Sequence, residues 1–147
     1  MSENQTQTPP PIEPPPPAAP PSAPPPNPDS QARTWNMLCH LSALAGFVGV
    51  PLGNVLGPLI VWQIKKNEIP SVDAHGKAAL NFQLTVLIGL FASIIAGLVL
   101  SVICIGYVFF FVAMAIGLIG LIFPIIAGIK ANNGEDYKYP WSIEFVK

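Results

Sequence analysis

Few residues in this chain could do chemistry, and most of them lie inside or beside long apolar runs. His40 is the only histidine or charged residue in residues 35–64, and Ser42 follows it two positions later, which is not a triad spacing. Cys39 and Cys104 stand alone in apolar segments, without a CxxC or Cys/His cluster. Phosphate loops and nucleophile elbows are also absent from the sequence. We therefore predict no catalytic residue, no metal site and no cofactor, and we expect a protein that is not an enzyme.

Polar side chains at the start of the second apolar run are better candidates for contacts than for catalysis. A stripe recurs at every fourth residue: Asp73, Lys77, Asn81 and Thr85. Amide side chains in hydrocarbon require hydrogen-bond partners. We interpret four residues as candidate intramembrane polar contacts: His40, Lys77, Asn81 and Gln83. They could line a proton or substrate path, or form interhelical hydrogen bonds that set helix register, and the second interpretation is favoured. His75 is assigned to the preceding loop.

The composition indicates a membrane protein. Only 10% of the 147 residues are charged and 51% are hydrophobic, whereas soluble domains carry roughly 25% charged residues. A soluble fold of this size could not cover its surface with so few charges. The net charge of -1 offers no basic face for phosphates, so we exclude nucleic acid as a partner.

The N-terminal tail, residues 1–32, is rich in proline and has almost nothing to bury. Proline removes backbone donors, so the tail is expected to be disordered with polyproline II character. It lacks the basic start and apolar stretch of a signal peptide. The tail could bind a polyproline-binding domain of a partner or act as a solvated spacer, and the spacer is favoured.

Two long segments, residues 35–64 and 78–129, contain no Lys, Arg, Asp or Glu. A spanning helix needs about 20 apolar residues, so the second segment predicts two helices, at 73–103 and 107–131, with a turn near Cys104. The first segment could form one kinked helix or two short helices, at 34–49 and 52–66, because Pro51, Gly53, Gly57 and Pro58 interrupt it. The two-helix hairpin is favoured. The expected fold is an all-α integral membrane protein with three to four transmembrane or re-entrant helices in residues 33–147.

Charge placement predicts the orientation. Lysines gather in the loop 65–77 and after the last helix, and none lies near the turn at Cys104. The positive-inside rule then places this loop and the C-terminus in the cytoplasm of a bacterial inner membrane. The hairpin keeps the N-terminus cytoplasmic as well. The aromatic residues of the tail 132–147 are expected to anchor it at the lipid interface.

Small residues recur at spacings of four and predict close helix packing. The two sets are Gly49, Gly53 and Gly57, and Ser93, Gly97 and Ser101. They could form the interface of a homo-oligomer or of a complex with another membrane protein. Contacts between helices of one chain are the favoured alternative.

Four stretches carry a family resemblance: MLCHLSALAGF, GPLIVWQIKKNE, VDAHGKAALNFQLT and IIAGIKANNGEDYKYPW. Together they resemble a bacterial membrane domain grouped with the chloroplast import component, the Tic-twenty-like family. The resemblance covers residues 33–143 and implies about four membrane helices with no established catalytic residue. We expect a scaffold or accessory subunit in the lipid bilayer of the inner membrane. The alternative that the resemblance implies is a component of a transport or protein-translocation system.

Overall fold

The computed structural model describes residues 28–147, and within them all regular structure is helical. The elements are α1 (Pro28–Leu41), the 3-10 helix η1 (Ser42–Val48), α2 (Gly53–Lys65), α3 (Pro70–Leu100), the 3-10 turn η2 (Ser101–Ile103) and α4 (Gly106–Asn132). The all-helical prediction is confirmed. Most of the predicted tail lies outside the described residues, but its boundary at 32 is too late, because α1 begins at Pro28. Proline suits the first turn of a helix, where its missing N–H needs no partner.

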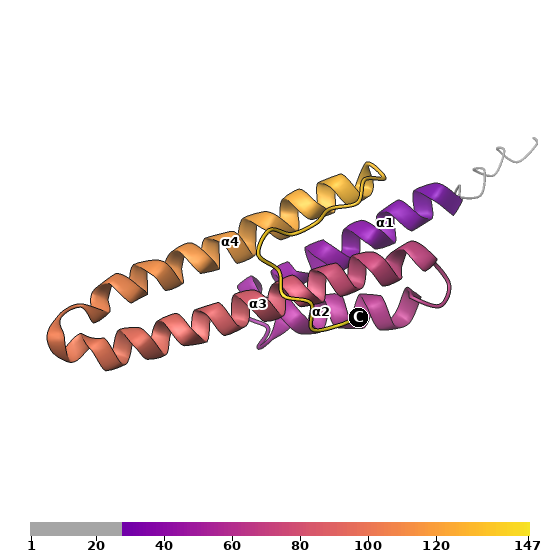
Figure 1. The fold of residues 1–147 in the computed structure, drawn as a ribbon. Helices are drawn as coiled ribbons and strands as arrows, with labels where there is room; N and C mark the ends of the chain where they lie inside the picture. The colour runs from indigo at the N-terminus through magenta and orange to yellow at the C-terminus, as the bar shows by residue number, and fades with distance from the viewer. Residues whose placement is uncertain (1–27) are drawn as a thin grey trace, which may run out of the picture.

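Helices α3 and α4 form one long antiparallel hairpin (Figure 1). Both are long and apolar enough to cross a membrane. The turn between them follows η2, and Cys104 adopts a positive φ of 62° there. Gly106 is required at this turn, since a Cβ on it would lie 2.2 Å from the carbonyl oxygen of Gly97. The predicted helix 73–103 begins three residues late, because Pro70 opens α3.

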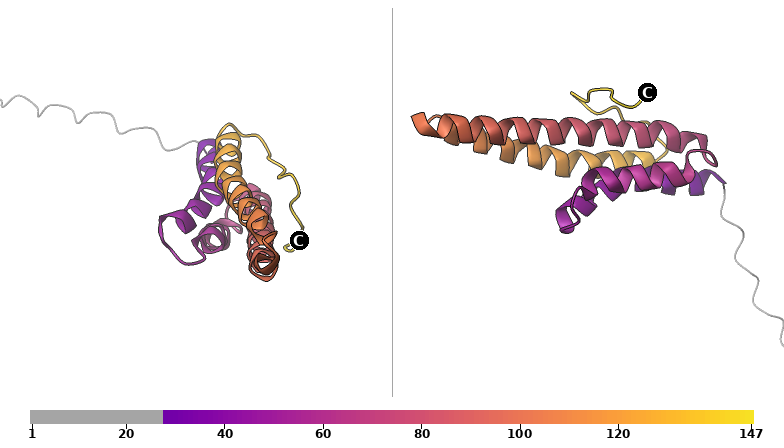
Figure 2. Two further views of the ribbon diagram at one scale, coloured as in Figure 1. Left: turned by 90° about the vertical axis from the view of Figure 1, so that its left-hand side faces the viewer. Right: turned by 90° about the horizontal axis from the view of Figure 1, so that it is seen from below.

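Helices α1 and α2 form a second, shorter hairpin that packs against one end of the first (Figures 1 and 2). Its bend contains Gly49 with a φ of 91° and Leu52 with a φ of 56°. The predicted first helix, 34–49, is wrong at both ends, since α1 covers Pro28–Leu41 and the chain tightens into η1. The helix breakers therefore produce a bend, as the two-helix alternative expected.

Glycines allow this bend to close tightly. A Cβ on Gly57 would lie 2.2 Å from the carbonyl oxygen of Ser42, and one on Gly53 would lie 2.7 Å from the carbonyl carbon of Ala45. Gly49 does not share their face, since it lies outside α2 with open space around it. The contacts of Gly53 and Gly57 are thus made within the chain, between α2 and η1.

The second small-residue set is also divided in the structure. Ser93 and Gly97 are buried in α3, and Gly97 approaches Phe110 of α4. Ser101 belongs to η2 instead, and its hydroxyl donates to the carbonyl oxygen of Leu98 at 2.7 Å. Ser93 and Gly97 therefore contribute to the contact between α3 and α4.

The two ends of α3 differ sharply in their surroundings. We call residues 70–87 the covered half, because α1, α2 and the chain after α4 pack around it, and residues 88–100 the bare half. No large hydrophobic residue of the covered half is exposed, and its buried residues include Val72, Leu80 and Phe82. The bare half exposes Ile88, Phe91, Ile94, Ile95, Leu98 and Val99.

Candidate functional site

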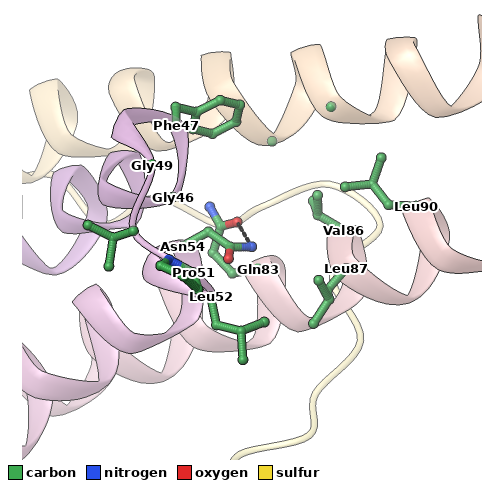
Figure 3. A pocket seen from close by; sticks show the side chains of 13 residues that line it. Gly46, Phe47, Gly49, Pro51, Leu52, Asn54, Gln83, Val86, Leu87 and Leu90 are labelled. Carbon is green, nitrogen blue, oxygen red and sulfur yellow. Dashed lines mark hydrogen bonds between the residues drawn. The ribbon is translucent and has the colours of Figure 1, made fainter.

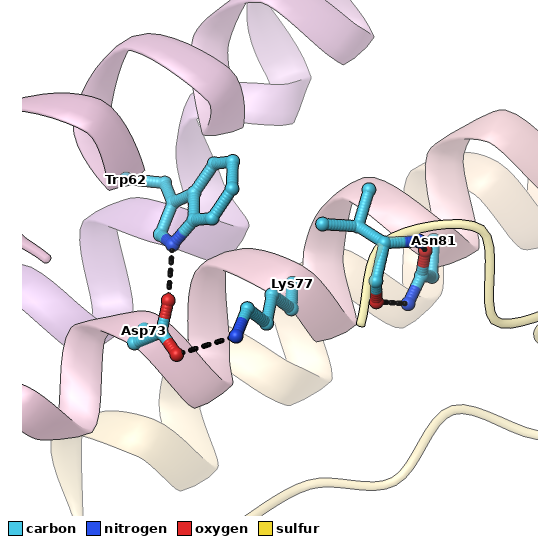
Figure 4. A network of polar contacts seen from close by, with 5 residues as sticks. Trp62, Asp73, Lys77 and Asn81 are labelled. Carbon is cyan, nitrogen blue, oxygen red and sulfur yellow. Dashed lines mark hydrogen bonds and ion pairs between the residues drawn. The ribbon is translucent and has the colours of Figure 1, made fainter.

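The chain after α4, residues 133–147, returns along the covered half of α3; we call it the C-terminal segment (Figure 1). Gly134 allows the reversal, with a φ of 82°. The amide oxygen of Asn81 accepts hydrogen bonds from the backbone N–H groups of Phe145 at 2.9 Å and Val146 at 2.7 Å. Its nitrogen donates to the carbonyl oxygen of Val146 at 3.0 Å (Figure 4). One side chain therefore acts as a hydrogen-bonding partner for an extended backbone.

Tyr139 anchors the middle of the C-terminal segment. Its ring stacks on Phe82 with centroids 4.1 Å apart and planes inclined by 15°. It is 5% exposed, whereas Trp141 is 79% exposed. The prediction that these aromatics all lie at the lipid interface is therefore wrong for Tyr139, which contributes to the core cluster with Phe82.

Two buried histidines connect Tyr139 to α1 and α3. Nδ1 of His40 lies 2.8 Å from the hydroxyl oxygen of Tyr139, and Nε2 of His40 lies 3.0 Å from Nδ1 of His75. Nε2 of His75 lies 3.4 Å from the carboxylate of Asp136. A carboxylate only accepts, so His75 carries its proton on Nε2 and accepts from His40 at Nδ1. His40 then accepts the hydroxyl proton of Tyr139, and every donor has one acceptor.

We call the linked side chains of Tyr139, His40 and His75 the histidine chain. Burial keeps it neutral. His40 is fully buried, and burial, reinforced by the neighbouring His75, lowers the pKa of His40 well below its usual value. Burial also raises the pKa of the Tyr139 hydroxyl, and Tyr137 and Cys39 add to the effect. Among residues 28–147, no group of three or more His, Cys, Asp and Glu side chains could hold a metal ion. The chain of hydrogen bonds is therefore suited to holding the C-terminal segment in place.

The predicted polar residues do not meet one another. His40 and Asn81 each contact a different part of the C-terminal segment. Lys77 pairs with Asp73 at 2.6 Å, and Asp73 also accepts the indole N–H of Trp62 at 2.8 Å (Figure 4). These contacts join α2 to α3 and leave no common polar path through His40, Lys77 and Asn81.

His75 was missed as a contact residue because it was assigned to the lysine-rich loop 65–77, although the predicted helix 73–103 already included it. The helix begins at Pro70, so His75 occupies the second turn of α3 and faces α1. Pro70 itself was the available signal, since proline favours the first helical position. The docking of Tyr139 had no comparable signal, because aromatic residues after a membrane helix are typical of interfacial anchors.

The fourth candidate, Gln83, lines a cavity of about 410 Å³ between the bend and the long hairpin (Figure 3). Its amide oxygen lies 3.5 Å from Nδ2 of Asn54. Its Nε2 is buried and has no hydrogen-bond partner among the residues that the structure describes. Among the described residues, Gln83 is therefore the candidate that combines a place in this cavity lining with an unpartnered amide nitrogen.

The two apolar helices and the all-helical fold of the described residues indicate a membrane protein. The model of the MamF/MmsF family, described as a magnetosome magnetite crystal formation protein family, matches residues 31–146. The chain belongs to this family. No curated protein and no solved structure matches it. The predicted membership of the Tic-twenty-like family is wrong, and the import role implied by that resemblance loses its basis.

Proposed function

We propose that this chain is a non-enzymatic accessory protein of the membrane in which magnetite crystals form. The observation that carries the proposal is the family match over residues 31–146, which includes the complete α2, α3 and α4 and nearly all of α1. The hydrogen bonds at the histidine chain and at Asn81 support a role in presenting a surface, because they hold the C-terminal segment in place.

The length of α3 supports a specific membrane placement. Pro70–Ile103 contains 34 residues, or about 51 Å at 1.5 Å per residue, whereas the hydrocarbon core measures about 30 Å. Counting back about 20 residues from Ile103 brings the hydrocarbon boundary close to Gln83. The bare half of α3 then lies in lipid, and most of the covered half lies at the membrane surface. In this placement the α1–α2 hairpin is re-entrant only at its bend.

Lysines support a cytoplasmic location for the covered half. Lys65, Lys66, Lys77, Lys130, Lys138 and Lys147 all belong to the end of the fold away from the η2 turn. By the positive-inside rule this end, with the C-terminus and the start of α1, faces the cytoplasm. The same rule applies to an internal membrane derived from the inner membrane, so the η2 turn would face the crystal compartment.

One surface suits a protein partner or a second copy of the chain. Leu56, Ile60 and Ile64 are spaced four apart on α2 and are 42%, 56% and 56% exposed. In the proposed placement they lie near the membrane surface rather than deep in hydrocarbon. A contact with a membrane protein or a homo-oligomer would remove this stripe from water. A polyproline-binding partner of residues 1–27 is a further proposal, for a part of the chain outside the described residues.

The experiment is complementation in a magnetosome-forming bacterium that lacks its own family member. The chain, fused to a fluorescent protein, is expressed and its position is compared with the crystal chain, and crystal diameters are measured by electron microscopy. We expect localisation at the crystal-containing compartments and restoration of crystal size. Uniform distribution in the cell membrane together with unchanged small crystals would contradict the proposed function. An Asn81→Leu variant, which loses three hydrogen bonds to the C-terminal segment, tests whether the presented surface matters.

A further inference from the structure

The cavity beside Gln83 has apolar walls from three parts of the chain. The bend contributes Val50 and Leu52, α3 contributes Val86 and Leu90, and α4 contributes Gly117 and Gly120. Val50 and Leu52 are 47% and 58% exposed, so the rim is open at the outer surface. A volume of about 410 Å³ lies within the roughly 300–1,000 Å³ of typical small-molecule sites.

Glycines on α4 keep this space open. A Cβ on Gly117 would meet no atom within 4 Å, so this glycine is not required for helix contact. A Cβ on Gly120 would lie 2.9 Å from Cγ1 of Val86, so this glycine allows α3 and α4 to approach below the cavity. The cavity thus has a closed base and a side wall without side chains.

Two amide side chains, Asn54 and Gln83, belong to the lining of this otherwise apolar space. Gln83 is 1% exposed, yet its Nε2 has no partner among the described residues. An unpaired amide costs free energy wherever water is excluded, so such groups normally have a partner. Gln83 also lies close to the hydrocarbon boundary estimated from the length of α3, which is the depth of the ester carbonyls of a glycerophospholipid.

We propose that the cavity binds one glycerophospholipid, whose ester carbonyl accepts a hydrogen bond from Nε2 of Gln83. One acyl chain lies between the bend and the walls formed by Val86 and Leu90, past Gly117. The two halves of the site match the two parts of the lipid: a donor at the boundary and an apolar space beyond it. This inference depends on the membrane placement and not on the role in magnetite formation.

The test uses the full chain purified in mild detergent and titrated with dioleoyl phosphatidylglycerol, with bound lipid counted by native mass spectrometry. We expect one lipid per chain. Replacing both esters with ether links removes the acceptor and should weaken binding about fivefold, the effect of one neutral hydrogen bond. Gln83→Leu should weaken ester-lipid binding by a similar factor and abolish the difference between ester and ether lipids.

Two variants on α4 test whether the cavity itself is the site. Gly117→Leu adds a side chain whose Cβ meets no atom within 4 Å, and by filling part of the cavity it should abolish the bound lipid. Met114→Leu places a leucine one turn away, at a 60% exposed position outside the cavity, and should bind lipid normally. Circular dichroism and gel filtration establish that each variant folds. Equal binding of ester and ether lipids by the unmodified chain, or full binding by Gly117→Leu, would overturn the proposal, whatever the result of complementation.

Discussion

The covered and bare halves of α3 belong to one continuous helix, yet they are stabilised in different ways. The covered half buries Val72, Leu80 and Phe82 against other parts of the chain. The bare half leaves Ile88, Phe91 and Leu98 exposed and contacts α4 through the small residues Ser93 and Gly97. The two halves also differ in composition, because the covered half carries Asp73, Lys77 and Asn81 whereas Ser93 is the only polar side chain of the bare half. The distinction comes from the polar residues between the apolar ones.

Three polar residues of the covered half each bind another segment. Asp73 binds Trp62 of α2, His75 binds His40 of α1, and Asn81 binds the C-terminal segment. Side-chain hydrogen bonds are directional, so they specify which segment packs at which level of the helix. In the proposed placement lipid surrounds the bare half, so this half needs no polar contacts to select a neighbouring segment. The comparison suggests that polar residues on a membrane helix mark where protein, rather than lipid, is its neighbour.

The largest loss of stability is expected where α2 packs against η1 in the α1–α2 hairpin. Gly57→Ala would place a Cβ 2.2 Å from the carbonyl oxygen of Ser42, and separating these backbones should cost about 3 kcal/mol or more. We expect a correspondingly lower thermal unfolding temperature in detergent. Gly117→Ala is the control, because its Cβ meets nothing within 4 Å. Equal stability of the two variants would show that α2 does not pack as described.

One lysine on the bare half and one on α2, which packs on the covered half, test the proposed placement directly. Ile95 on the bare half is 58% exposed and Ile64 on α2 is 56% exposed, so a lysine at either site has equal room. Ile95→Lys lies near the centre of the proposed span and should cost about 3 kcal/mol of insertion free energy. Ile64→Lys lies beside Lys65 and should cost little. Insertion is measured as the fraction of glycosylated product in a translocation assay, and equal insertion of both variants would contradict the placement.

Removing the central histidine should release the C-terminal segment. In His40→Phe the hydroxyl of Tyr139 and Nδ1 of His75 both lose their partner, which should cost about 2 kcal/mol. The segment should then be cleaved faster by protease in the folded protein. Tyr107→Phe is a control, since Tyr107 is 63% exposed at the opposite end. Cleavage at an unchanged rate would show that the histidine chain does not hold the segment.

Much of the fold could be predicted from the sequence because charge-free runs and helix breakers act locally. The absence of charges from 78 to 129 indicates two apolar helices, and the glycines and prolines near Pro51 indicate the bend. Helix ends were less accurate, since the prolines at 28 and 70 begin helices three to six residues before the predicted starts.

The contacts of the candidate site could be predicted only in part. The sequence identified His40, Asn81 and Gln83 as polar residues in need of partners, but not the partners themselves. Those partners lie far along the chain, as in the pairing of His40 with Tyr139. Tyr139 follows the last helix, and nothing local distinguishes a docked aromatic residue from an interfacial one.

Replacing the unpartnered amide of Gln83 should raise the stability of the protein instead of lowering it. Gln83→Leu removes a buried Nε2 that has no partner among the described residues and should raise stability in lipid-free detergent by about 1 kcal/mol. The measurement is the unfolding temperature after delipidation. Asn81→Leu is the matched control on the same helix, and it should lower stability because Asn81 is fully bonded. A lower unfolding temperature for Gln83→Leu would mean that this amide already has a partner.

The smallest effect is expected from mild acid, and it concerns the covered half alone. Because burial lowers the pKa of His40 in the folded protein, the unfolded chain binds a proton more readily, and stability falls as the pH drops below about 6.5. A protonated His40 also cannot accept the hydroxyl proton of Tyr139. The other groups that face this site are His75 of α3, beside His40, and Asp136 of the C-terminal segment, beside His75. Amide hydrogen exchange between pH 7 and 5, corrected for intrinsic rates, should therefore quicken in the C-terminal segment and stay constant in the bare half. The dependence should be smaller in His40→Phe, in which His75 is the remaining buried histidine, and uniform acceleration along α3 would instead indicate general unfolding.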